Sequence, residues 1–324
     1  MSENKRKHKD PNHRAFVRRM IVLVVAAFLF LIVALLETFV PFQTWLPAYA
    51  LPAREEGTMR IHFLSVGQGD CTIIEFPGGD CLVVDAGDGS FRNDNKIYRY
   101  LKGLTFSRLS VVATHADVDH CGGVGNILLR YRADRLYLPA LDSKSKFYMD
   151  MLKRARRRGT ATEALSRYDV ITDSSGAYMT CISPYSIEET NGNDASALLY
   201  LRYGETVVLL GADVSSTRER RLMREYAADD TIFDSGEYIV RLEETDILKV
   251  SHHGSDASSS EEWLELLGAT TAIISCGADN AYKHPGGEAI TRLAKYVRDL
   301  YRTDELGDII VTLTQTSYTV TYAA

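Results

Sequence analysis

The sequence predicts an α/β sandwich, with helices on the outer faces of packed sheets, preceded by one membrane-spanning helix. From residue 59 onward, short β-rich runs alternate with turn signals and longer helical patterns, and two hairpins occur late in the chain. Strands with interspersed helices are typical of packed sheets that helices cover. Before this region, residues 20–36 form an unbroken apolar run.

The composition is that of an ordinary folded protein. Of 324 residues, 45% are hydrophobic and 25% are charged, which excludes collagen-like, disordered and disulfide-dense proteins. The net charge of -6 argues against a protein that coats nucleic acid indiscriminately, because that requires a clustered excess of Lys and Arg. A local basic patch remains compatible with this charge.

The N-terminal segment has the pattern of a membrane anchor. Residues 1–19 form a basic tail, with seven Lys and Arg residues against two acidic ones, and residues 20–42 are long enough to span the hydrocarbon layer. We expect the tail in the cytoplasm, residues 43–57 as a stalk and the rest outside the cell, in a single-pass membrane protein. A buried core helix would be amphipathic, unlike this run. A cleaved signal peptide remains the alternative, because Ala48-Tyr49-Ala50 has the form of a cleavage site, and the domain would then be secreted.

Residues 58–324 are predicted to form one domain, because no linker divides them. The expected strands are 59–66, 71–76, 81–85, 109–114, 135–139, 178–183, 197–203, 206–210, 246–251, 271–276, 308–314 and 318–322. The expected helices are 95–104, 123–131, 144–158, 216–226, 259–267 and 287–301.

Five cysteines without any CxxC spacing exclude a zinc finger and a full disulfide framework. Cys71 and Cys81 flank the turn at residues 77–80. They either form a disulfide across this turn or are two unrelated buried thiols.

Four candidate metal ligands follow the apolar strand 109–113. His115, Asp117, Asp119 and His120 fall within six residues, just before a Gly-Gly turn, so their side chains can converge on one point at the end of the strand. Imidazole nitrogen with carboxylate oxygen suits a divalent ion such as zinc or manganese. The alternative is a polar loop in which Asp117 or Asp119 caps a helix and both histidines are solvated.

Two further strand ends carry residues of the same types. Asp213 follows the strand 206–210, where it is either a ligand or the cap of the next helix. His252 and His253 follow the strand 246–251, and adjacent residues of a regular strand point in opposite directions. At most one of the two is therefore an easy ligand, unless the strand has already ended at Ser251. Three such strand ends would gather ligands at one edge of a sheet.

These motifs resemble the metallo-β-lactamase superfamily, and most of all the metallo-hydrolase domain of ComEC-type competence proteins, a family of DNA-uptake channels. The matching segments run in family order from residue 59 to about residue 285. They are 65–70, 84–87, 114–123, 193–196, 210–213, 249–255 with Ser258 and Ser259, and 280–285. The single apolar run is too little for the channel of those proteins, so we do not expect this chain to import DNA.

The resemblance implies a four-layer αβ/βα sandwich with two divalent ions, zinc or manganese, at one end of the sheets. By position, His115 and Asp117 would hold one ion, and Asp119, His120 and one of the paired histidines the other, with Asp213 bridging. By analogy with phosphorylcholine esterases, His253 would be the ligand and His252 would face a substrate phosphate. Asp117 stands where the superfamily usually has a second histidine, and the first ion also lacks its usual third imidazole.

The resemblance also implies roles around the ions. Asp213, His252 and His284 would act on the hydroxide or the phosphate, and Ser255 would donate to the phosphate oxygens. Asp70 and Asp85 would either stabilise tight turns or support the ligands, and Asn193 would lie near the vacant ligand position or form a turn. Lys283, between Tyr282 and His284, departs from the family's pattern, and a lysine there would contact a phosphate or be solvated.

We therefore predict a membrane-anchored, extracellular, metal-dependent phosphodiesterase, a nuclease that cuts single-stranded DNA with a metal-activated hydroxide. The basic stretch 144–158, with Arg154 and Arg157, would follow the phosphate backbone or form a solvated helix face. The alternatives are a phosphodiesterase acting on a small or wall-linked substrate such as phosphorylcholine, and a tethered metal-binding protein without activity. The expected partners are DNA or another phosphodiester, and the membrane.

Overall fold

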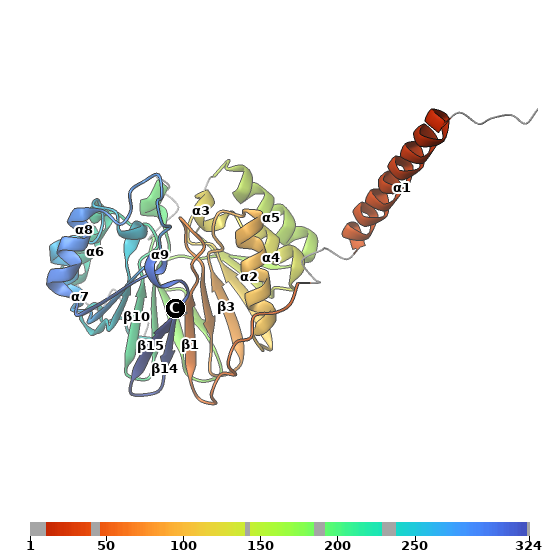
Figure 1. The fold of residues 1–324 in the computed structure, drawn as a ribbon. Helices are drawn as coiled ribbons and strands as arrows, with labels where there is room; N and C mark the ends of the chain where they lie inside the picture. The colour runs from red at the N-terminus through yellow and green to blue at the C-terminus, as the bar shows by residue number, and fades with distance from the viewer. Residues whose placement is uncertain (1–10, 40–45, 140–142, 185–191, 229–237, 323–324) are drawn as a thin grey trace, which may run out of the picture. The chain divides into compact units, whose positions relative to one another are not determined.

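A computed structural model describes residues 11–39, 46–139, 143–184, 192–228 and 238–322 (Figure 1). The chain divides into two units, residues 1–49 and residues 50–324. In the first unit, helix α1 (Pro11–Phe39) contains a span, Ala15–Ile32, that is long and apolar enough to cross a membrane. The predicted anchor, residues 20–42, begins inside this helix. Residues 40–42 of the anchor lie outside the residues that the structure describes. Residues 46–57, within the predicted stalk, contain no helix or strand.

The second unit is built on two mixed sheets. The first has the strand order β15-β14-β1-β2-β3-β4-β5-β6, and the second the order β13-β12-β11-β10-β9-β8-β7. Each sheet is antiparallel in one half and parallel in the other. The strands of the first sheet are β1 (Met59–Phe63), β2 (Thr72–Glu75), β3 (Asp80–Val84), β4 (Arg108–Val112), β5 (Arg135–Leu138), β6 (Ala161–Ala164), β14 (Ile309–Leu313) and β15 (Tyr318–Tyr322).

The second sheet packs face to face against the first. Its strands are β7 (Val170–Thr172), β8 (Tyr178–Ser183), β9 (Leu198–Tyr203), β10 (Thr206–Leu210), β11 (Ile247–Lys249), β12 (Thr271–Ile274) and β13 (Asp299–Arg302). Successive side chains of β1 point to opposite faces of the sheet, and this alternation shows how the core forms. Met59, Ile61 and Phe63 enter the core between the sheets, whereas Arg60 and His62 face the other side, where His62 contacts Tyr100 of a covering helix.

Helices cover the outer face of each sheet, so the domain has the four layers αβ/βα that the sequence resemblance implied (Figure 1). The first sheet is covered by α2 (Phe91–Gly103), α4 (Val124–Arg130) and α5 (Lys146–Arg158). The second is covered by α6 (Ser216–Ala228), α7 (Glu261–Leu267) and α8 (Gly287–Tyr296), which form a second apolar core with it. The remaining short helices of the described residues are α3 (Val118–Cys121), α9 (Thr303–Leu306) and the 3₁₀ turns Gly192–Ala195, Leu242–Glu244 and Ser251–Gly254.

The structure differs from the predicted elements at the edges of the sheets. Strands β6, β7 and β13 are absent from the prediction. In place of β13, the predicted helix 287–301 continued through residues 297–301. The helix ends at Tyr296 because Val297 is extended, and residues 299–302 then pair in parallel with β12. The short edge strands β6 and β7 have mostly partly or fully exposed residues, so they lack the apolar alternation that identifies a strand. All five cysteines are free and buried. Cys71 and Cys81 are therefore two unrelated buried thiols and not a disulfide, which was one of the two alternatives.

Candidate metal centre

The parallel strands of both sheets direct their C-terminal ends to one edge, where the predicted ligand segments meet. His115 follows β4, Asp213 follows β10, and His253 lies in the 3₁₀ turn after β11. His120 lies on α3, the short helix that begins after His115. The loop between β1 and β2 adds Asp70 to the same region.

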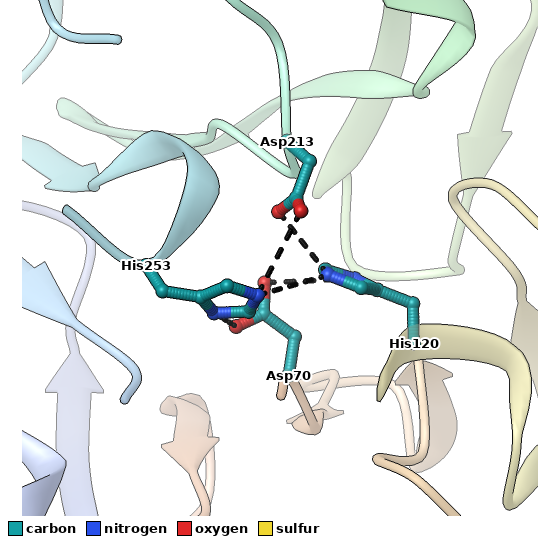
Figure 2. A group of neighbouring side chains, drawn as sticks. All are labelled: Asp70, His120, Asp213 and His253. Atoms are coloured by element: carbon teal, nitrogen blue, oxygen red, sulfur yellow. Dashed lines mark hydrogen bonds and ion pairs between the residues drawn. The ribbon is translucent and has the colours of Figure 1, made fainter. Parts of the chain in front are cut away.

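Four buried side chains form the centre of this site (Figure 2). One potential ligand atom of each of Asp70, His120, Asp213 and His253 lies within 4.8 Å of those of the others. The Nε2 atom of His120 is 3.1 Å from Asp213 Oδ1, and Nε2 of His253 is 3.7 Å from Asp213 Oδ2. Two imidazole nitrogens and two carboxylates therefore converge in the protein interior.

Hydrogen bonds on the far side of each ring direct Nε2 toward the centre. The Nδ1 atom of His120 lies 2.8 Å from Asp85 Oδ2, and that of His253 lies 2.9 Å from the carbonyl oxygen of Ser275. Each Nδ1 therefore carries a proton, which leaves Nε2 to face the centre. The two Nε2 atoms lie 3.3 Å apart, so a proton or a metal cation is needed between them to offset the repulsion of their lone pairs.

The donor set fits a divalent cation. Asp70 Oδ1, Asp213 Oδ1 and His115 Nε2 are buried and have no hydrogen-bond partner among the described residues. Buried polar atoms in native proteins are normally paired, so these atoms indicate a binding site for a charged group. Imidazole nitrogen with carboxylate oxygen is the ligand set of zinc and manganese sites.

Asp85 supports this arrangement through a strained turn. It follows β3 with a φ of 59°, a conformation that Asp adopts more readily than most residues. Its Oδ1 accepts the backbone N–H of Thr114 at 2.8 Å, and its Oδ2 accepts the Thr114 hydroxyl at 2.6 Å as well as the His120 ring. Both oxygens are thus occupied by neighbours, and Asp85 orients His120.

Both paired histidines reach the site because the strand ends early. Strand β11 stops at Lys249, and His252 and His253 then have left-handed φ values of 50° and 55°. His253 is buried in the centre, whereas the His252 side chain is 27% exposed at its rim, with Nε2 3.9 Å from Asp213 Oδ2 and 3.2 Å from Asn193 Nδ2. Gly254 follows in a tight turn, where a Cβ atom would approach Pro285 to 2.8 Å.

Charges in the centre shift the acid and base strengths of these groups. Burial alone would lower the pKa of His253, but the carboxylates of Asp213 and Asp70 outweigh it and raise this pKa to about 9. Burial alone would raise the pKa of Asp213, yet the rings of His120 and His253 hold it well below its usual range. The carboxylates are therefore ionised, as metal binding requires.

The family follows from comparison with known proteins. The sequence profile described as the metallo-beta-lactamase superfamily matches residues 64–278. The chain belongs to this superfamily. It is 26% identical over 265 residues to ComE operon protein 3 of Bacillus subtilis (strain 168). This match covers 77% of this chain and 32% of that protein.

Two other relatives support this assignment and the resemblance to ComEC-type proteins. Recombination protein 2 of Haemophilus influenzae is 26% identical over 263 residues, covering 80% of this chain and 29% of that protein. Competence protein ComA of Neisseria gonorrhoeae is 27% identical over 126 residues, covering 39% of this chain and 16% of that protein. The chain thus spans less than a third of the length of these curated relatives.

His115 and Asp117 form a more open side of the superfamily site. His115 is buried, with Nε2 3.7 Å from Asp117 Oδ2 and 3.9 Å from Asp213 Oδ2. The Asp117 side chain is 55% exposed, and it precedes α3 without a capping hydrogen bond, so the alternative of a simple cap is not what the structure shows. This side has a carboxylate where the superfamily usually has an imidazole.

We expect His115→Ala to reduce turnover less than loss of a central ligand, by about tenfold, because this side offers fewer buried ligand atoms to a cation than the central group. Metal content measured by mass spectrometry should fall by less than half. Equal loss of activity and of all bound metal would contradict a weaker ion on this side.

Asp70 belongs to the central group but approaches the two rings from their Nδ1 sides, with Oδ2 3.9 Å from His120 Nδ1. Its Oδ1 is 3.4 Å from His253 Nδ1, and its Oδ2 forms an ion pair with the ammonium of Lys249. Burial alone would raise the pKa of Asp70, but Lys249 and His253 hold it below its usual range.

Lys249 is a functional candidate that sequence reasoning missed. It is the last residue of a fully buried strand and is 1% exposed. A lysine within the apolar run Ile247–Val250 could have revealed it, because a buried ammonium requires an anionic partner.

The other predicted site residues lie at the rim or farther out. Ser255 accepts the backbone N–H of Ala257 at 3.3 Å within its own turn, and Lys283 is exposed. Asp119 is at the rim, with Oδ2 3.4 Å from His253 Nε2. The ring centroids of His284 and His252 lie 5.4 Å apart.

The two predicted arginines of α5 differ. Arg154 forms an ion pair with Asp150 at 2.7 Å and donates a hydrogen bond to Asn126, so its guanidinium is engaged within the helical layer. Arg157 is exposed. Of the two, Arg157 is the one available to a substrate.

Proposed function

We propose that this chain is a metal-dependent phosphodiesterase that cuts single-stranded DNA, with two divalent ions, zinc or manganese, held by the central group and its open side. The buried group Asp70, His120, Asp213 and His253 carries this proposal, because it gathers ligand atoms within 4.8 Å of one another around unsatisfied lone pairs. Bound divalent cations lower the pKa of a water toward neutrality and polarise a phosphoryl oxygen, which favours phosphodiester hydrolysis.

The chain's own residues have distinct tasks in this proposal. Asp85 fixes the proton on His120 Nδ1, and the Ser275 carbonyl fixes that of His253. Asp213 orients the attacking water, since it faces both ligand histidines and His252.

Two imidazoles at the rim are placed to contact the phosphate. His252 is partly exposed beside Asp213. His284 has a buried Nδ1 without a hydrogen-bond partner among the described residues, so Nε2 is the ring nitrogen that would face the phosphate. Neither ring is needed to complete the central group, which leaves both for the substrate.

Single-stranded DNA is supported as the substrate by two observations. The relatives include proteins named for recombination and for competence. Lys153, Arg156, Arg157 and Arg158 are exposed on α5, which packs against α3, the helix that carries His120. Exposed basic residues on one helix can follow a phosphate backbone. We further propose that α1 anchors the chain in the cell membrane with the domain outside the cell.

Turnover of two substrates by the full chain in detergent tests this function. We expect cleavage of single-stranded DNA with zinc or with manganese, abolished by a chelator, because bound ions would activate the attacking water. Phosphorylcholine esters should be turned over at least about tenfold more slowly, since the basic residues then have no further phosphate to bind.

Two outcomes would contradict the proposal. Turnover of phosphorylcholine esters without DNA cleavage would assign the protein to small or wall-linked phosphodiesters. Turnover of neither substrate, with less than one tightly bound ion per chain, would identify a binding protein instead.

A further inference from the structure

Tyr282 is an exposed aromatic residue next to the site, and no step of the mechanism uses it. It lies in the loop between β12 and α8, and its side chain is 70% exposed. Among the described residues its hydroxyl has no hydrogen-bond partner. Single exposed aromatic residues are common, so the exposure alone carries no inference.

The neighbouring rings distinguish Tyr282 from an ordinary surface tyrosine. Its ring stacks on that of His284, with centroids 5.9 Å apart and planes inclined by 26°. His284 in turn stacks on the central residue His253, at 6.3 Å and 28°. Three rings, each stacked on the next, therefore lead from the central group to the surface.

The backbone around Tyr282 is held in one conformation. The Oδ1 atom of Asn280 accepts the N–H groups of Tyr282 and His284, at 3.1 and 3.0 Å, and its Nδ2 donates to the carbonyl of Gly277 at 2.8 Å. The loop is also joined to the His253 segment, where Gly286 N–H donates to the Gly254 carbonyl at 2.8 Å. The backbone that carries Tyr282 is thus held in place beside the His253 segment, so a ligand that stacks on the ring does not have to order the loop.

The chemistry of this position favours a nucleobase over a quaternary ammonium group. Quaternary ammonium groups are bound in cages of several aromatic rings. Tyr282 contacts a single ring among the described residues, and the exposed ammonium of Lys283 next to it would repel a cation. A flat base adjoining a phosphate suits both side chains, because the ring stacks on the base and the ammonium attracts the phosphate.

We propose that Tyr282 is the stacking platform for one base of a single-stranded nucleic acid, beside the phosphodiester that the metal centre cleaves, and that Lys283 contacts the adjoining phosphate. This proposal rests on the proposed function and adds a subsite to it. It also explains how a site of this superfamily could prefer an unpaired strand, since a base within a duplex is not available for stacking.

Binding without cleavage tests the platform directly. The full chain in detergent, with a chelator present, is titrated against a fluorescent oligothymidylate and against a strand of equal length that carries abasic sites. Tyr282→Ala should weaken binding of the oligothymidylate about tenfold and leave binding of the abasic strand unchanged, because stacking requires the base. Tyr282→Trp should retain or strengthen binding of the oligothymidylate.

Tyr322→Ala is the matched control, because Tyr322 is an exposed tyrosine on β15 that contacts Tyr301. Its affinity for both strands should equal that of the unaltered chain. Unchanged oligothymidylate binding by Tyr282→Ala, or equal weakening for the two strands, would overturn the stacking role. Cleavage of single-stranded DNA by the unaltered chain is measured in parallel, so that failure of the platform is distinguished from failure of the nuclease function.

Discussion

Replacing Asp213 by alanine is expected to abolish hydrolysis and to release bound metal while the domain stays folded. The carboxylate of Asp213 lies within 3.9 Å of Nε2 of each of His115, His120, His252 and His253. Loss of a residue that only supports a ligand typically costs 10–100-fold in metal affinity or activity, so the loss here should exceed about 100-fold. Turnover of single-stranded DNA and metal content by mass spectrometry measure both effects.

The fold should survive this change because Asp213 contributes charge rather than packing. It is 3% exposed, and the rings of His120 and His253, which hold its pKa well below the usual range, lose a favourable charge partner when it is replaced. The thermal unfolding midpoint of the metal-free variant should therefore decrease, while the domain still unfolds in one cooperative transition. Asp246→Asn is the matched control, because Asp246 accepts the Val207 N–H at the opposite end of the strands and should leave turnover unchanged. Unchanged turnover in Asp213→Ala would refute its role.

Most of the site was predictable because its residues follow apolar strands. His120, Asp213 and His253 each follow a strand that pairs in parallel with a neighbour, and parallel strands direct their C-terminal ends to one edge. Local sequence is sufficient to recognise such strand ends. The αβ/βα layers likewise followed from the alternation of strands and helices, and from the family resemblance.

The position of Asp70 was not predictable from its neighbours in sequence. It lies in a loop between two antiparallel strands, and its direction depends on contacts with a distant segment. The Asp70 N–H donates to the carbonyl of Asp119 at 3.1 Å, and Gly69, with a φ of 141°, approaches the same carbonyl so closely that a Cβ atom would lie 2.4 Å from its oxygen. Only the folded chain brings these segments together.

Lys249→Met should destabilise the metal-free domain strongly and make it dependent on metal. The Lys249 ammonium is buried and forms an ion pair with Asp70, whose carboxylate would be left without its counter-charge. Removing one partner of a buried pair costs about 3–5 kcal/mol, which corresponds to a decrease of the unfolding midpoint on the order of 10 °C for a domain of this size.

Lys295→Met is the matched control, because the ion pair of Lys295 with Glu261, at 2.7 Å, is largely exposed and screened by solvent, so its loss should leave the midpoint nearly unchanged. Thermal unfolding with a chelator should separate the two variants clearly. An unchanged midpoint in Lys249→Met would contradict the expected cost.

The response to metal then distinguishes two roles of Asp70. If Asp70 is a ligand, a divalent cation supplies the positive charge that Lys249→Met lacks, so zinc or manganese should raise the midpoint of this variant more than that of the unaltered chain. The double variant Lys249→Met/Asp70→Asn should be more stable than Lys249→Met alone without metal, because no unpaired charge is buried, and should lose the extra response to metal. If metal raises the midpoints of Lys249→Met and of the double variant equally, Asp70 is not a ligand and only supports the centre through its ion pair with Lys249.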